Sequence, residues 1–145
     1  MSQIKLYCHL IFATKHRESA INLEHCDDLY RFIAAQLRKQ GCYVYAINGG
    51  LDHVHACIDL PSTVPPADIV RDVKRTSSSW ASSCGLFPKF RGWGEGYGLF
   101  SVSPSHRDAV IEYIRKQKEH HRAVPFDDEY RRILNLYGIA FDDPA

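Results

Sequence analysis

Two histidines in a strand-like segment have the clearest capacity for chemistry in this sequence. His53 and His55 flank Val54 in the run DHVHACI, residues 52–58. Alternate side chains of a strand share a face, so both imidazoles would lie on one side, about 7 Å apart along the chain. They could bind one metal ion there, or hold a structural zinc together with Cys57 on the same face. The pair could also be two partly exposed polar residues.

A second pair lies further along the chain, in a helix-like segment. Tyr113 and Gln117 are four residues apart, so in a helix they share a face. Alone they could simply belong to a packing stripe with Val110 and Ile114. Combined with the histidines, they predict a metal-assisted reaction at a phosphodiester. A metal held by neutral His and Gln ligands keeps its charge and can polarise a phosphodiester. A Tyr hydroxyl can then attack the phosphorus and form a phosphotyrosine, which lets DNA be rejoined without ATP.

Hydrophobic periodicity predicts the elements that position these residues. Glycines 49 and 50 form a hairpin turn, and Ser105 with Asp108 is a capping signal for the tyrosine helix. The order βαββαβ, then helices, predicts an α+β fold: a ferredoxin-like antiparallel sheet with additional C-terminal helices carrying the tyrosine. The expected strands are 4–14, 42–48, 51–60 and 97–103, and the expected helices are 23–40, about 65–80, about 105–121 and 126–137.

Length and composition indicate one folded domain, residues 1–145. The hydrophobic share of 45% and the aromatic share of 12% argue against disorder. No apolar run approaches the ~20 residues of a membrane helix, and no signal peptide is evident. Five cysteines without a CxxC pair favour a reducing compartment, so we expect a cytoplasmic protein without a membrane partner. The glycines at 92–98 precede no G-K-[ST], which argues against a nucleotide cofactor.

Charge is distributed unevenly although the formal net charge is only +1. Residues 71–91 carry five basic side chains and one acid, whereas residues 125–145 carry two basic side chains and five acids. A basic middle is compatible with a DNA backbone contact and equally with an ordinary solvated surface. The candidates for phosphate contacts are Lys15, Arg17, Arg71, Lys74, Arg75 and Arg91.

Four segments, in this order, resemble a known family. The chain is similar to the small single-tyrosine transposases of bacterial insertion sequences, relatives of the REP-associated tyrosine transposases, whose His-hydrophobic-His motif is called HUH. The resemblance spans roughly residues 5 to 143. Its segments are YCHLIFATKHR at 7–17, DHVH at 52–55, GYGLFSVS at 96–103 after Trp93, and VIEYIRKQKEHH at 110–121, with a family-like ending at 137–142. Asp59 and His16 depart from the usual family pattern.

The resemblance implies specific roles. Tyr113 would be the nucleophile, and His53, His55 and Gln117 would bind Mg²⁺ or Mn²⁺. Cleavage of single-stranded DNA with hairpin ends would leave a 5′-phosphotyrosine and a free 3′-OH. The partner would be a second copy of the chain, in a homodimer. A non-cutting protein that binds DNA hairpins is the alternative from another class.

Overall fold

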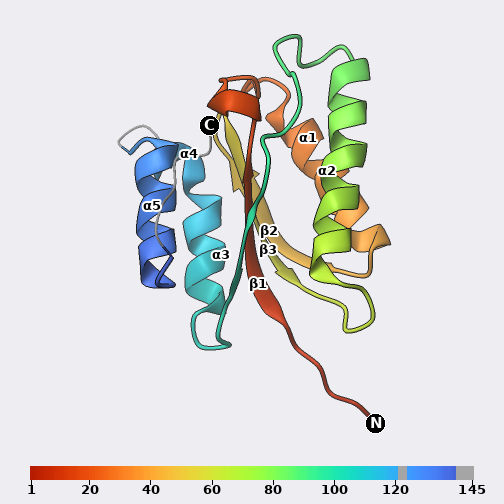
Figure 1. The fold of residues 1–145 in the computed structure, drawn as a ribbon, viewed down its shortest axis with the longest axis vertical. Helices are drawn as coiled ribbons and strands as arrows, with labels where there is room; N and C mark the ends of the chain where they lie inside the picture. The colour runs from red at the N-terminus through yellow and green to blue at the C-terminus, as the bar shows by residue number, and fades with distance from the viewer. Residues whose placement is uncertain (121–123, 140–145) are drawn as a thin grey trace.

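Four antiparallel strands form the centre of the molecule. The computed structural model describes residues 1–120 and 124–139 (Figure 1). The strands are β1 (Tyr7–Ala13), β2 (Tyr43–Gly49), β3 (His53–Asp59) and β4 (Gly98–Ser101). They lie in the order β2-β3-β1-β4, with every neighbouring pair antiparallel. This order brings β3 and β1 to the middle of the sheet, so the His-x-His strand has a neighbour on each side.

Helices cover both faces of the sheet. Two helices from the first part of the chain lie on one face, and three C-terminal helices lie on the other (Figure 1). We call these the α1–α2 face and the α3–α5 face. The predicted fold class is therefore confirmed. The helices are α1 (Cys26–Lys39), α2 (Pro66–Ser83), α3 (Arg107–Arg115), α4 (Gln117–His120) and α5 (Phe126–Leu136), with a short 3-10 turn η1 at Lys15–Arg17.

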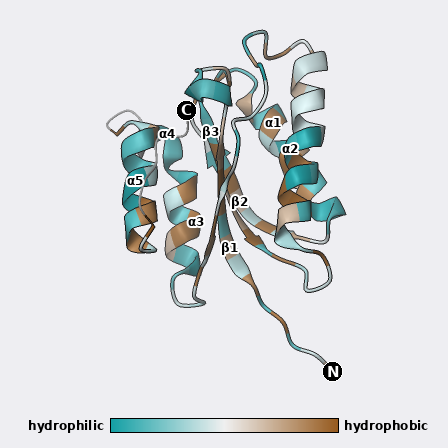
Figure 2. Cartoon of the chain, in the orientation of Figure 1, coloured by the Kyte–Doolittle hydropathy of each residue, from teal (hydrophilic) through white to brown (hydrophobic). Residues whose placement is uncertain are grey.

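The main core lies between the sheet and the α1–α2 pair. Alternate strand residues, among them Leu10, Val54 and Ile58, are fully buried there against residues such as Leu29 and Ile69. A smaller cluster on the α3–α5 face is built around Ile11, Phe100, Phe126 and Leu134. In Figure 2, α3 and α5 carry both hydrophobic and hydrophilic residues, as expected of helices that cover a partly polar face.

The tyrosine helix differs from its prediction. The expected continuous helix from about 105 to 121 ends at Arg115, and Lys116 (φ −95°, ψ 13°) separates it from α4. The Nδ2 of Asn48 on β2 donates to the carbonyl of Arg115 at 3.0 Å, so a tertiary hydrogen bond meets the helix where it breaks. The capping prediction is also wrong, because α3 begins after His106 and no side chain caps it. Residue 121, and residues 140–142 of the family-like ending, lie outside the described residues.

All five cysteines are free thiols. None of the helices in the described part of the chain has the length and apolar character needed to cross a membrane.

Candidate active site

Three histidines project from the centre of the sheet towards α3–α5. His53 and His55 alternate along β3, and both are fully buried; His9 on β1 is 7% exposed. Their burial excludes the interpretation of the pair as partly exposed surface residues. Buried imidazoles need hydrogen-bond partners or a ligand, so the contacts of these rings indicate what the site is built to hold.

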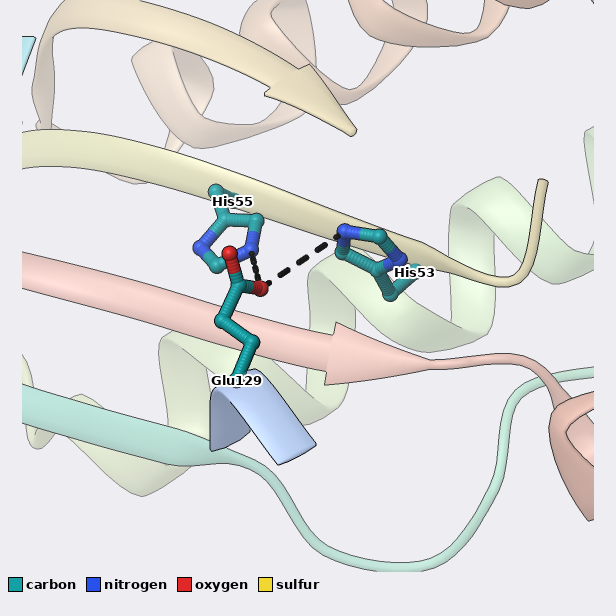
Figure 3. Close-up of side chains that lie close together, drawn as sticks. All are labelled: His53, His55 and Glu129. Carbon is teal, nitrogen blue, oxygen red and sulfur yellow. Dashed lines mark hydrogen bonds and ion pairs between the residues drawn. The ribbon is translucent and has the colours of Figure 1, made fainter. Parts of the chain in front are cut away.

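Glu129 of α5 completes a candidate metal site. Its Oε1 lies 2.9 Å from Nε2 of His55 and 4.0 Å from Nε2 of His53 (Figure 3). The three ligand atoms all lie within 4.8 Å of one another, and all three residues are buried. This group could bind a metal ion. Among the described residues Cys57 is not part of the group, so the His-His-Cys zinc alternative is not supported.

Gln117 joins the same cluster from the start of α4. Its Oε1 lies 3.1 Å from Nε2 of His53, and its Nε2 donates to Oε2 of Glu129 at 3.1 Å. The Tyr113 hydroxyl also donates to Oε2 of Glu129. The structure thus brings Tyr113 and Gln117 together with both histidines, although the helix between them is broken. Burial, and then the hydrogen bond to Glu129, raise the pKa of Tyr113 well above its ordinary value.

The neighbours of the histidine rings suit a bound cation. Nδ1 of His53 lies 2.8 Å from Oδ1 of Asp52, a carboxylate that can only accept, so this nitrogen carries a proton. In the neutral ring with this tautomer, the lone pair of Nε2 faces the carbonyl oxygen of Gln117 at 3.1 Å. Two acceptors at this distance repel each other unless a proton or a metal ion lies between them. A metal-binding His whose second nitrogen is held by a carboxylate is a common arrangement in metalloproteins.

His55 has a corresponding support from β1. Its Nδ1 lies 2.8 Å from Nε2 of His9. Burial and the neighbouring His55 lower the pKa of His9 to about 3, so His9 is neutral at physiological pH. A neutral His9 can accept the Nδ1 proton of His55. In that tautomer the lone pair of His55 Nε2, which lies 2.9 Å from Oε1 of Glu129, faces the candidate metal site. His9 was not among the predicted site residues. Its place on the strand paired with β3 could have suggested it.

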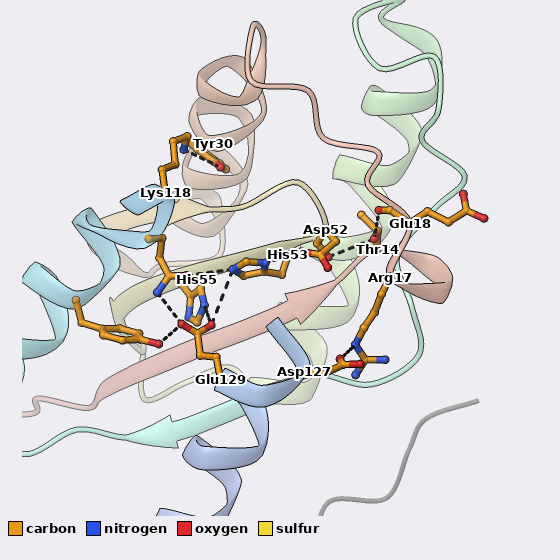
Figure 4. A network of polar contacts seen from close by, with 12 residues as sticks. Thr14, Arg17, Glu18, Tyr30, Asp52, His53, His55, Lys118, Asp127 and Glu129 are labelled. Atoms are coloured by element: carbon orange, nitrogen blue, oxygen red, sulfur yellow. Dashed lines mark hydrogen bonds and ion pairs between the residues drawn. The ribbon is translucent and has the colours of Figure 1, made fainter. Parts of the chain in front are cut away.

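Helix α5 is held over the site by aromatic and charged contacts. The ring of Phe126 stacks on His53, with centroids 4.3 Å apart and an interplanar angle of 13°. Arg17 forms an ion pair with Asp127 (Figure 4). Its guanidinium lies 5.7 Å from the centre of the Phe126 ring. Arg17, a candidate for DNA contacts, therefore contacts α5.

The other DNA-contact candidates have diverse surroundings. Lys15 and Arg91 line one surface hollow together with Lys89. Lys74 is half-buried and donates to the carbonyls of Gly94 and Gly96 at 2.7 and 2.8 Å, which ties the glycine-rich segment to α2.

The two arginines of α2 remain on the surface. Arg71 lies 3.0 Å from Asp68, and Arg75 lies 3.6 Å from Asp72. Both side chains are well exposed. Asp59 does not reach the histidines: it accepts from the backbone N–H of Leu6 at 3.0 Å and pairs with Lys5.

Comparisons with known proteins identify the family of this chain and related folds. The family described as "Transposase IS200 like" matches residues 2–117. Among curated proteins no sequence matches significantly. A crystal structure of a protein from Deinococcus radiodurans R1, assigned as a transposase, is 26% identical over 81% of this chain and 94% of its own, with a TM-score of 0.62. A REP-associated tyrosine transposase bound to a REP hairpin has the same TM-score, with 19% identity over 86% of this chain and 76% of its own.

The family match covers most of the chain and contains both histidines, Tyr113 and Gln117. The likeness to the REP-associated protein adds agreement in fold. This chain belongs to the IS200-like transposase family, whose members act in DNA transposition.

Proposed function

We propose that this protein cleaves and rejoins single-stranded DNA with Tyr113 as the nucleophile. The observation that carries the proposal is the convergence of the Tyr113 hydroxyl and the His53, His55 and Gln117 side chains on one buried carboxylate, that of Glu129. A packing stripe would not require this meeting of polar groups. Polar groups that are buried together and face one another are expected at a functional site.

The proposed cofactor is Mg²⁺ or Mn²⁺, held by His53, His55 and Gln117, with Glu129 as an additional ligand. Two imidazoles, an amide oxygen and a carboxylate offer mixed nitrogen and oxygen donors, which suit Mn²⁺ and allow Mg²⁺. When bound, the ion would supply positive charge to a phosphodiester oxygen and offset charge that develops in the transition state.

The residues would act in two stages. In cleavage, the oxygen of Tyr113 attacks the phosphorus, the bond from phosphorus to the 3′ oxygen breaks, and a 5′-phosphotyrosine and a 3′-OH result. In rejoining, a 3′-OH attacks the phosphotyrosine and Tyr113 leaves. One phosphodiester replaces another in each stage, so no nucleotide is consumed.

The proposed substrate is single-stranded DNA with hairpin ends. The likeness to a REP-associated transposase that is bound to a hairpin supports this choice. Lys15 and Arg91, which line the same hollow, are the best placed of the proposed phosphate contacts, followed by the exposed Arg71 and Arg75. We propose further that two copies of this single-domain chain act as a homodimer, as the family resemblance implies.

A non-cutting hairpin-binding protein is the second candidate function. It is favoured by the covered state of the site, because His53, His55 and Gln117 have no exposed surface under α5. A protein that only binds DNA would not need the four residues to meet, so we place this candidate second.

The test is a denaturing gel. Labelled single-stranded oligonucleotides from the DNA that flanks the gene are incubated with protein and Mn²⁺, for the native chain and for Tyr113→Phe. We expect a covalent protein–DNA band that disappears in the variant while hairpin binding on native gels remains. Complexes on native gels with no covalent band from either protein would favour the non-cutting binder.

A further inference from the structure

The carboxylate of Glu129 presents its two oxygens to two different groups. Oε1 faces the histidines, at 2.9 Å from Nε2 of His55 and 4.0 Å from Nε2 of His53. Oε2 accepts hydrogen bonds from the Tyr113 hydroxyl and, at 3.1 Å, from Nε2 of Gln117. Oε1, which faces the candidate metal site, is thus a different atom from Oε2, which accepts the hydrogen bond of Tyr113. One carboxylate can therefore contact a metal ion and the tyrosine at the same time.

The nucleophile needs such a partner. Tyr113 is half-buried, and its hydroxyl donates to Oε2 of Glu129, so the phenol carries its proton in this arrangement. A neutral phenol is a weak nucleophile, so its proton has to leave as the bond to phosphorus forms. Within the described residues, Oε2 of Glu129 is a carboxylate oxygen that already accepts this proton in a hydrogen bond.

We propose that Glu129 is the general base for Tyr113. In cleavage the Tyr113 proton moves to Oε2 of Glu129, the bond from the tyrosine oxygen to phosphorus forms, and the bond from phosphorus to the 3′ oxygen breaks. The departing 3′ oxygen takes a proton from water. In rejoining, a 3′-OH attacks the phosphotyrosine, gives its proton to water, and Glu129 returns its own proton to the departing Tyr113. This inference rests on the proposed function of Tyr113.

The surroundings of Glu129 keep its carboxylate in place for this role. The side chain is 2% exposed, so water does not compete for Oε2. The amide of Gln117 fixes the plane of the carboxylate from one side, and His55 contacts it from the other. At the start of α5, Phe126 stacks on His53, which places the helix at a defined height above the sheet. A pre-positioned base of this kind avoids reorganisation during the reaction.

The test separates proton transfer from metal binding. Glu129→Gln keeps the size of the side chain and removes its capacity to accept the tyrosine proton. We expect single-turnover formation of the covalent adduct to slow by about 10²-fold or more. Calorimetric titration with Mn²⁺ and hairpin binding on native gels should change by only a few-fold, because both histidines and Gln117 remain and the amide introduced at position 129 still offers an oxygen to the metal. Glu112→Gln, on the exposed face of α3, is the matched control and should behave as the native protein.

The decisive arm replaces Tyr113 with 3,5-difluorotyrosine, whose phenol loses its proton more easily. We expect this residue to recover most of the rate lost in Glu129→Gln, since an acidic phenol depends less on a base. Loss of Mn²⁺ binding in Glu129→Gln, with rescue by excess Mn²⁺ and none by fluorination, would overturn the proposal and leave Glu129 as a ligand only. An unchanged or faster rate in Glu129→Gln would also overturn it. If Tyr113→Phe still gives the covalent band, the nucleophile assignment itself fails, which is a separate result.

Discussion

The two faces of the sheet are built from the same strands and differ sharply in what they bury. On the α1–α2 face, β3 contributes Val54 and Ile58 to an apolar core. On the α3–α5 face, the alternate positions of the same strand contribute His53 and His55 to a cluster of buried polar groups. Apolar packing stabilises the fold on the first face. On the second, polar groups are stabilised by each other, at the cost of losing water. The comparison shows that one strand can contribute to an apolar core on one face and to a cluster of buried polar groups on the other.

The largest effect is expected from a substitution on the α3–α5 face. His55→Ala removes a candidate metal ligand and the hydrogen-bonding partner of both His9 and Glu129. We expect formation of the covalent adduct to fall by at least ~10³-fold. Gel assays of adduct formation, with calorimetric titration of Mn²⁺, measure this. Normal cleavage by His55→Ala with a chelator present would show that this face holds no catalytic metal.

Val54, the neighbour of His55 in the sequence, faces the apolar core. Its substitution should lower stability and leave adduct formation largely intact. Val54→Ala leaves a cavity in the apolar core and should lower the free energy of unfolding by about 1.5–3 kcal/mol. Adduct formation by the folded protein should remain within a few-fold of the native rate. Urea unfolding and single-turnover assays at low temperature measure the two quantities. A large loss of activity in folded Val54→Ala would mean that the faces are not independent.

A smaller effect, on Mn²⁺ affinity, is expected from a substitution at Gly50, where the backbone passes close to the His53 ring. A Cβ added at Gly50 would lie 2.7 Å from Cε1 and 3.2 Å from Nδ1 of the His53 ring. Gly50→Ala should therefore shift this imidazole, weaken its contact with Asp52, and lower Mn²⁺ affinity by about 10- to 100-fold. Calorimetry measures the affinity. Gly94→Ala is the control, because its added Cβ would meet no atom nearer than 3.4 Å.

The smallest effect is expected at the surface, away from both faces. Replacing Lys15 and Arg91 together by Ala should weaken hairpin binding and make the dependence of log K on log salt concentration shallower by about 2. Native gels or fluorescence anisotropy at several salt concentrations measure this. Lys39→Ala on α1 should leave both quantities unchanged. An unaltered salt dependence in the double variant would remove the hollow they line from the proposed DNA path.

Local periodicity predicted the strands and helices well, because burial repeats every two residues in a strand and every three to four in a helix. The alternation along 52–58 predicted that His53 and His55 share a face. The positions of Tyr113 and Gln117 predicted that they lie near each other, and both meet at Glu129. The helix break at Lys116 was not predicted, since it coincides with a hydrogen bond from Asn48, which is far away in the sequence.

The surface charges were the least predictable part. Arg17 and Lys74 were predicted as DNA contacts from charge and position. The fold also pairs Arg17 with Asp127 and ties Lys74 to loop carbonyls, and the sequence predicted neither contact. A basic side chain on a helix or loop end carries no local signal of its partner. Only the folded chain shows whether its charge faces solvent or another segment.

The sequence by itself determined the sheet with its two alternating faces, and with them the placement of His53 and His55 on one side. Tertiary structure decided which carboxylate meets the histidines. Glu129 lies 74 residues after His55, in the first turn of α5 beside Asp127 and Asp128, and nothing in the local sequence singles it out from these two acids. The physical reason is that strand and helix periodicity relates only residues that are close in the sequence, whereas the contact between Glu129 and the histidines joins distant segments. The contacts that dock α5, among them the Phe126–His53 stack and the Arg17–Asp127 pair, join segments that are far apart in the sequence.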